Sequence, residues 1–274
     1  MAETFYQVIQ RAIADVSENG FDTEGRIAFW CAEIRRAAIE HLIPESQLDQ
    51  QLRAAFGQIY TKLVEKGEIA KYHQGVERFT IDKVRPHLRA ELDRRIMASA
   101  SLIKLNRQES IDATIRRFQG WATSIPAGGQ RESDKAEATK NVKKKLQQMP
   151  YVERRVVIDQ SAKLTASINE IIASDGGAIA LRWKSHFRQL NYNFRPDHKA
   201  RDGRIYAMRG NWALKAGLMK AGPDGYYDEI TAVAEEPFCR CYAVYIYAIG
   251  RLPDDMLTEK GKAELARVRV EAAR

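Results

Sequence analysis

Four side chains in the last third of the sequence have the chemistry of a metal site. His198, Asp202, Cys239 and Cys241 offer imidazole, carboxylate and thiolate donors, and zinc binds cysteine and histidine in tetrahedral sets. On a β-strand, the two thiols of a Cys-x-Cys pair point to the same face. However, structural zinc sites usually space their cysteines more widely, and these residues leave a fourth ligand unnamed. The sequence therefore predicts no bound cofactor or metal, and zinc on His198, Cys239 and Cys241 is the alternative.

The same residues also have a purely structural interpretation. Asp202-Gly203 is typical of a turn between two short strands, in which Gly203 supplies backbone freedom. His198 and Asp202 would hydrogen-bond to the backbone, and the cysteines would be buried thiols beside the last strand. Charge-assisted pairs would hold the turn in place: Arg195 and Arg240 with Asp159, Asp197 or Asp202.

Recognisable catalytic motifs are absent from the sequence. A nuclease of the His-Asn-His type needs further His or Asn ligands on a following helix, and no histidine follows His198. There is no Gly-x-Ser-x-Gly elbow, no Walker-type loop and no Gly-x-Gly-x-x-Gly. We therefore expect a protein that is not an enzyme, with a metal-dependent nuclease as the alternative.

The elements that must position these side chains follow Pro150. Apolar residues at helical spacing predict a helix over residues 151–174. Three short segments then favour strands: residues 178–183, 204–208 and 242–249. We expect a small antiparallel sheet packed on this helix, with Trp183, Val244 and Ile246 facing it.

The N-terminal half is expected to be helical. Amphipathic patterns predict a three-helix unit within residues 1–67, with Cys31 in its core and Asp22 or Thr23 capping its second helix. Residues 68–81 are expected to form a small hairpin or a loop. Three more helices are predicted: residues 83–105, 109–122 and 133–148. Proline and glycines in residues 124–130 predict a hinge loop.

The predicted fold class is therefore α+β and mainly helical, with a C-terminal domain in which a small antiparallel sheet packs on a long helix. Residues 1–125 form the predicted helical N-terminal region. Residues 131–257 form the C-terminal domain, and residues 258–274 form a terminal helix or tail.

Composition narrows the classes of protein. The chain has 274 residues, three cysteines and a net charge of +8, which favours a reducing compartment and permits contact with nucleic acid or an acidic protein surface. No apolar run is long enough to cross a membrane, and we expect no secretory signal. The basic residues within 83–104 and Lys143-Lys144-Lys145 are DNA-contact candidates, although acidic neighbours favour a salt-bridged, solvated surface.

Four pieces of the sequence, in order, carry a resemblance to a known family. They are Asp159-Gln160-Ser161-Ala162-Lys163-Leu164, the predicted strand with Trp183, Arg195 to Gly203, and Cys239-Arg240-Cys241. This order resembles the minor head proteins of tailed bacteriophages, the family named for the F protein of phage Mu. The chain departs from the family between Trp183 and His198, where the usual acidic pair is missing.

The resemblance implies a structural role for the residues that match, called the motif residues below: Asp159, Gln160, Lys163, Trp183, Arg195, His198, Asp202, Gly203, Cys239, Arg240 and Cys241. It implies a low-copy, oligomeric minor capsid protein of the virion, assembled in the bacterial host cytoplasm. Its expected partners are the portal or the major capsid protein, and its expected role is head morphogenesis, including DNA packaging or ejection. The alternative is a DNA-binding or metal-dependent DNA-cleaving accessory protein, and no membrane partner is expected.

Overall fold

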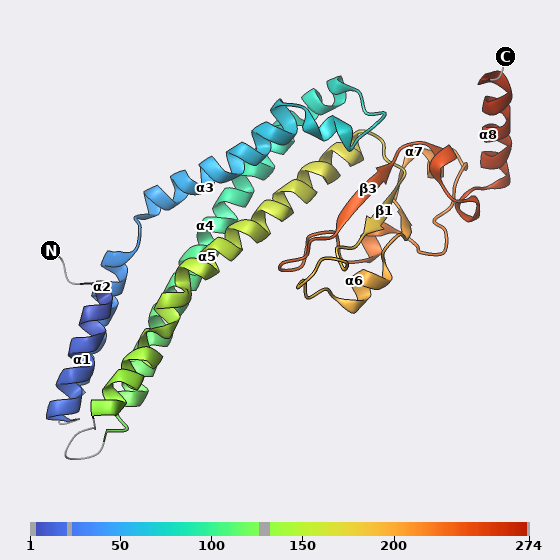
Figure 1. The fold of residues 1–274 in the computed structure, drawn as a ribbon. Helices are drawn as coiled ribbons and strands as arrows, with labels where there is room; N and C mark the ends of the chain where they lie inside the picture. Colours follow the sequence, from blue (N-terminus) through green and yellow to red (C-terminus); the bar gives the residue numbers. More distant parts are fainter. Residues whose placement is uncertain (1–3, 21–23, 126–131, 273–274) are drawn as a thin grey trace. The chain divides into compact units, whose positions relative to one another are not determined.

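The fold is α+β and mainly helical, as predicted, in a computed structural model that describes residues 4–20, 24–125 and 132–272 (Figure 1). The helices and strands are α1 Phe5–Asn19, α2 Glu24–His41, α3 Glu45–Tyr60, α4 Arg78–Ala122, α5 Glu132–Asp175, β1 Ala180–Lys184, α6 Pro196–Ala200, β2 Ile205–Ala207, α7 Trp212–Lys215, β3 Tyr242–Ile246 and α8 Glu259–Ala272. The expected caps Asp22 and Thr23 and most of the expected hinge at 124–130 lie outside the described residues.

The chain forms two compact units, and each is built from two separate segments. Unit 1 consists of residues 1–53 and 97–157, and unit 2 of residues 54–96 and 158–274. The two long helices α4 and α5 each contribute to both units. This division differs from the sequential domains expected from the sequence, because those boundaries were placed at loops.

Two expected breaks in the long helices do not exist. Residues 83–105 and 109–122 belong to the single helix α4, which begins at Arg78 and contains Pro86. Residues 133–148 and 151–174 likewise belong to α5, which continues through Pro150. No hairpin forms before α4, where a short 3₁₀ helix spans Glu68–Lys71. Proline is common in the first turn of a helix. Here Pro86 and Pro150 instead lie inside α4 and α5.

Unit 1 consists of helices packed around one apolar core. Apolar stripes of α1, α2, α4 and α5 pack together, including Ile9, Ile34, Phe118 and Val142, with Cys31 at the edge of the cluster. Thr4 begins α1 with a reciprocal capping box to Gln7.

An ion pair with little solvent exposure joins α4 to α5 within unit 1. The Arg107 guanidinium lies 2.6 Å from the Glu153 carboxylate and also donates to the Ile43 carbonyl at 3.2 Å.

Unit 2 carries the sheet, which is antiparallel as predicted. Its strand order is β2-β1-β3, with Leu181 opposite Tyr206 on one side and Tyr245 on the other. One face joins a cluster with Trp183 and the α5 residue Ala173. The other face packs on residues that follow the strands, such as Met256.

The expected orientation of β3 is wrong by one residue. Val244 is 44% exposed, and Ile246 belongs to the cluster on the face away from Trp183. Tyr245 and Ala243 instead join the Trp183 cluster. Because strand side chains alternate between faces, a shift of one residue exchanges the whole set.

Candidate functional site

His198 is held in the interior of unit 2 by a short helix and a strand. The helix α6 begins with Pro196 at its first position, which suits its fixed φ angle. His198 is 2% exposed, and its ring lies edge-on to Trp183 of β1, with 5.4 Å between ring centroids. The motif residues Trp183 and His198 thus belong to one packing arrangement.

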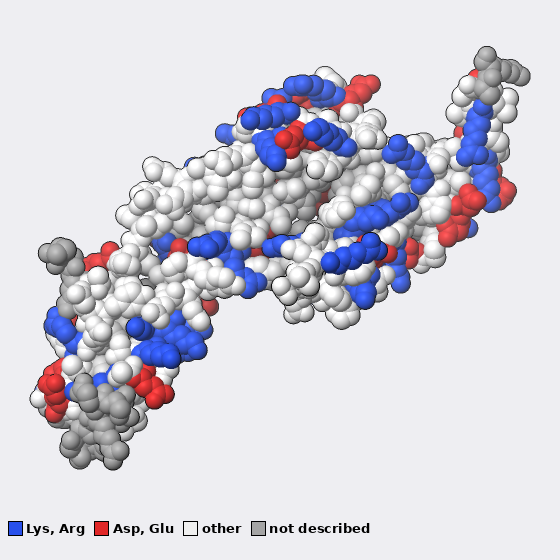
Figure 2. All heavy atoms as spheres, viewed as in Figure 1, with Lys and Arg blue, Asp and Glu red and all other residues white. Residues whose placement is uncertain are grey.

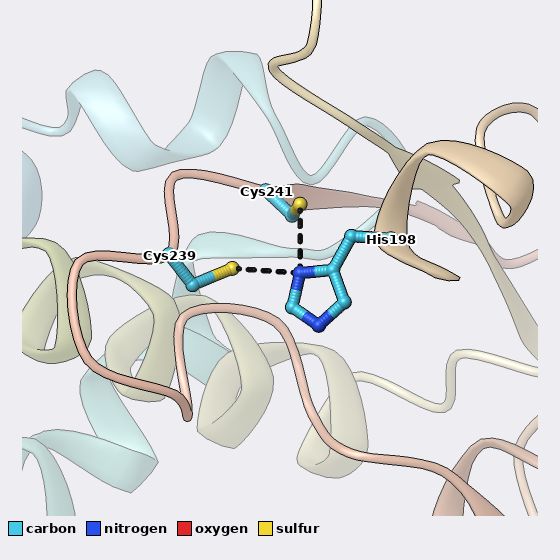
Figure 3. A group of neighbouring side chains, drawn as sticks. All are labelled: His198, Cys239 and Cys241. Carbon is cyan, nitrogen blue, oxygen red and sulfur yellow. Dashed lines mark hydrogen bonds between the residues drawn. The ribbon is translucent and has the colours of Figure 1, made fainter. Parts of the chain in front are cut away.

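Cys239 and Cys241 reach His198 from the loop before β3. Their Sγ atoms lie 3.4 and 3.6 Å from the same ring nitrogen, Nδ1 (Figure 3). Both cysteines are buried, at 1% and 5% exposure. The structure therefore brings together the three residues named as zinc candidates, and their donor atoms lie within 4.8 Å of one another.

A motif aspartate on α5 holds this loop, defined here as the cysteine loop, residues 235–241. Asp159 accepts a hydrogen bond from the backbone N–H of Phe238 at 2.5 Å, and Lys163 pairs with Asp159 at 3.0 Å. Gln160, beside it, accepts from Arg95 at 3.3 Å. Phe238 has a φ of 61°, which a non-glycine residue rarely adopts. The hydrogen bond to Asp159 stabilises the turn that places Cys239.

The pKa values of the two thiols are shifted in opposite directions. A hydrogen bond from Cys241 lowers the pKa of Cys239 to about 5, despite burial, which acts in the other direction. Donation of that hydrogen bond and burial raise the pKa of Cys241. The shared hydrogen bond therefore makes Cys239 the more acidic of the two thiols.

Asp202 and Gly203 lie beside this cluster and not in it. Asp202 accepts a hydrogen bond from the Ser185 backbone N–H at 2.8 Å, and Gly203 has a φ of 84°. Among the described residues, the group of donors that could hold a metal contains His198, Cys239 and Cys241 without Asp202. The turn interpretation thus fits Asp202 and Gly203, whereas His198 contacts thiols instead of backbone.

The ion pairs expected for the two motif arginines are wrong. Arg195 binds Glu236 at 2.5 Å and the Pro237 carbonyl at 3.0 Å. Arg240 lies 3.5 Å from the Gln189 side chain and 6.0 Å from the Tyr192 ring. Arg195 therefore anchors the cysteine loop, not the turn at Asp202.

Sequence reasoning missed Glu236, whose carboxylate lies 3.3 Å from His198 Nε2. It also missed Tyr192, whose hydroxyl donates to the Phe238 carbonyl and accepts from the Arg240 N–H, both at 3.2 Å. No known motif spacing connects Glu236 or Tyr192 to the motif residues. The one available signal was that Glu236 is close in sequence to Cys239 and that Tyr192 is close to His198.

A cavity of about 370 Å³ lies on the α5 side of the sheet. Its lining is mainly apolar and includes Ala166, Asn169, Val233, Cys241 and Tyr245. Burial raises the pKa of Tyr245 well above its usual range, so its hydroxyl stays protonated.

Comparisons of the chain with protein-family models, with curated proteins and with solved structures gave no match.

Proposed function

We propose that this chain is a structural minor head protein of a tailed bacteriophage virion. It would bind the portal or the inner capsid and act in head morphogenesis, with a role in DNA packaging or ejection. The proposal rests on the resemblance of the motif residues to the family named for the F protein of phage Mu.

One observation supports it: motif residues that are far apart in sequence meet in unit 2. Asp159 of α5 binds the backbone of Phe238, next to Cys239. His198 contacts both the ring of Trp183 and the thiol of Cys239. Short motifs that match a family by chance have no reason to pack against one another, so their convergence favours a shared structural origin.

Exposed apolar side chains offer surface for protein partners. Tyr242 is 55% exposed and Leu190 is 87% exposed in unit 2, and Phe29 is 55% exposed in unit 1. Aromatic residues are enriched at protein interfaces. By contrast, Tyr227 and Tyr245 are buried, so those two tyrosines belong to the core. No helix within the described residues is long and apolar enough to span a membrane.

The DNA-binding alternative receives less support from the charges. Basic residues of α4 have acidic partners: Lys83 with Asp175, Arg85 with Asp82, Arg94 with Glu91 and Lys104 with Glu45. On the face drawn in Figure 2, groups of lysine and arginine have acidic neighbours. Phosphate binding would have to compete with these pairs.

The test is a sedimentation assay with the portal protein encoded in the same genome and, separately, with duplex DNA, each at low and physiological salt. We expect the chain to co-sediment with the portal at both salt concentrations. Binding to DNA alone, with an affinity that falls steeply with salt, would contradict the proposal because each neutralised phosphate releases counterions.

A charge variant separates the two outcomes. Lys144 and Lys145 are exposed on α5. Changing both to glutamine should leave portal binding unchanged if the proposal is right, and should weaken binding if DNA is the partner.

A further inference from the structure

The two cysteines converge on one ring nitrogen of His198. Both Sγ atoms point at Nδ1 of His198, at 3.4 and 3.6 Å (Figure 3). When the ring proton lies on Nε2, Nδ1 has one lone pair and can accept from only one thiol. A cation between the three atoms would satisfy all of them at once.

The two sulfur–nitrogen distances fit a tetrahedral metal ion. Zinc lies about 2.3 Å from cysteine sulfur and about 2.0–2.1 Å from histidine nitrogen. Tetrahedral angles then separate sulfur from nitrogen by about 3.5 Å and the two sulfurs by about 3.8 Å. The observed Sγ–Nδ1 distances bracket the first value, and the donor atoms stay within 4.8 Å.

The far side of the histidine ring is arranged as in metal sites. Nε2 of His198 lies 3.3 Å from the Glu236 carboxylate, which Arg195 holds at 2.5 Å. A metal on Nδ1 would leave the ring proton on Nε2, close to this carboxylate, although neither of these two buried atoms has a hydrogen-bond partner in the structure. Such carboxylate–histidine–metal arrangements orient the ligand and strengthen its binding.

We propose that His198 Nδ1, Cys239 Sγ and Cys241 Sγ bind a zinc ion or another thiophilic divalent cation. Two thiolates and an imidazole suit zinc, and the two negative charges neutralise the ion in a buried site. Among the described residues, no fourth histidine, cysteine or carboxylate joins the group. A water molecule would therefore complete the coordination.

The role of this ion follows from what it would connect. His198 is on α6, and the cysteines end the loop that leads into β3. A metal would cross-link these two segments, which have little regular structure around them, and its binding free energy would add to folding. This inference goes beyond the proposed function, since the site would serve any function of unit 2.

The third cysteine provides a matched control for the test. Cys31 belongs to unit 1, whereas the cluster belongs to unit 2. The full chain is purified in reductant without chelator, and its zinc content is measured by mass spectrometry. We expect about one zinc per chain in the unchanged protein and in Cys31→Ser, and at least a tenfold loss in Cys239→Ser and Cys241→Ser.

A second measurement keeps the proposal falsifiable if those variants do not fold. Cobalt(II) added to the unchanged, metal-stripped chain should produce thiolate-to-cobalt charge-transfer absorption and tetrahedral visible bands, saturating at one equivalent. The positioning residue Glu236 should matter less, and Glu236→Gln should lower metal affinity about 10–100-fold with unchanged stoichiometry. A folded, reduced chain that binds neither zinc nor cobalt, or equal metal loss in Cys31→Ser, would overturn the proposal.

Discussion

His73 uses both ring nitrogens inside unit 2. Its Nδ1 accepts from the Tyr247 hydroxyl, and its Nε2 donates to the Asn169 side-chain oxygen at 3.0 Å. Its ring stacks on Tyr245, and it is 1% exposed. These contacts suit a neutral ring with its proton on Nε2, and the burial of the ring favours that uncharged form. Burial lowers the pKa of His73, and the bond to Asn169 only partly opposes this.

This shift predicts a stability that depends on pH. Since the folded pKa lies below the unfolded value of about 6.5, the unfolded chain binds more protons between the two values. The contribution of His73 should be fully present above pH 6.5 and should be lost as the pH falls through the folded pKa. In urea titrations, His73→Gln should cost about 1–3 kcal/mol at pH 8.

The difference between the unchanged chain and His73→Gln should shrink as the pH is lowered below 6.5. His87 on α4 is exposed and provides the control. His87→Gln should leave the stability at pH 8 unchanged. A difference for His73→Gln that stays constant from pH 8 to pH 5 would contradict the assigned neutral ring.

Trp183 allows a second test at the residue scale. Its side chain is completely buried. It lies edge-on to the ring of His198 and belongs to the apolar cluster on the face of the sheet that packs on α5. Trp183→Ala should lower the free energy of unfolding by about 3–5 kcal/mol in denaturant titrations. Trp212, which is 45% exposed, is the matched control, and Trp212→Ala should cost clearly less. Equal costs would mean that the Trp183 cluster is not a stabilising core.

The sequence predicts single residues well where one residue type has one physical use. Gly203 was expected for its backbone and has a positive φ, and Trp183 was expected in the core. The ion pairs of Arg195 and Arg240 were not predictable. An arginine can pair with any nearby carboxylate, and only the path of the cysteine loop brings Glu236 to Arg195.

At the scale of elements, α8 is docked through a glycine. Gly261 is buried, and a Cβ at this position would lie 2.1 Å from the Leu218 carbonyl oxygen. Thr258 caps the helix by accepting from the Gly261 N–H at 3.1 Å and donating to the Gly217 carbonyl at 2.7 Å. The sequence predicted only a terminal helix or tail over residues 258–274, whereas the first turn of α8 is fixed by close backbone contact.

Gly261→Ala should therefore displace α8, because backbone cannot retreat as a flexible side chain can. We expect a loss of stability of about 1–3 kcal/mol and faster hydrogen exchange in α8. Gly120 in α4 has open space where an alanine Cβ would lie, with no atom within 4 Å, and Gly120→Ala should instead stabilise by about 0.5–1 kcal/mol. A neutral Gly261→Ala would mean that α8 does not dock on Leu218.

Helix boundaries were the least predictable elements. Pro86 and Pro150 favoured helix starts, yet both lie inside long helices. A proline inside a helix costs about 3 kcal/mol, which tertiary packing over long helices can offset. Ile111, which follows Pro86, and Val142, which precedes Pro150, are both buried in the unit 1 core. The sequence shows that each proline favours the first turn of a helix. The tertiary packing that keeps the helix continuous through the proline is visible only in the folded structure.

At the scale of the whole molecule, neither compact unit is formed by one continuous stretch of the chain. His73 and Arg95, from the first segment of unit 2, bind Asn169 and Ser167, from the second. A fragment of residues 131–274, which starts where the C-terminal domain was predicted to start, lacks the first segment. It should unfold without a cooperative transition in circular dichroism, whereas residues 54–274 should keep one. Cooperative unfolding of the shorter fragment would show that residues 54–96 are dispensable.

Composition and periodicity were sufficient for the fold class at this scale, because the mainly helical pattern and three short strands are local properties. The division into units is not local. It depends on which halves of α4 and α5 pack on which neighbours, and no stretch of sequence between Glu68 and Asp175 marks it.

This interleaved connectivity gives protein synthesis a fixed order of events. Residues 54–96 leave the ribosome before their partners at 158–274 have been made. At roughly 5–20 residues per second, the roughly 60 intervening residues impose a wait of about 3–12 s. During that time the apolar side chains Leu88, Leu92 and Ile96, buried in the finished protein, lack the second segment of their unit. We therefore expect chaperones that bind helical, apolar segments to bind this nascent chain until β3 has been synthesised.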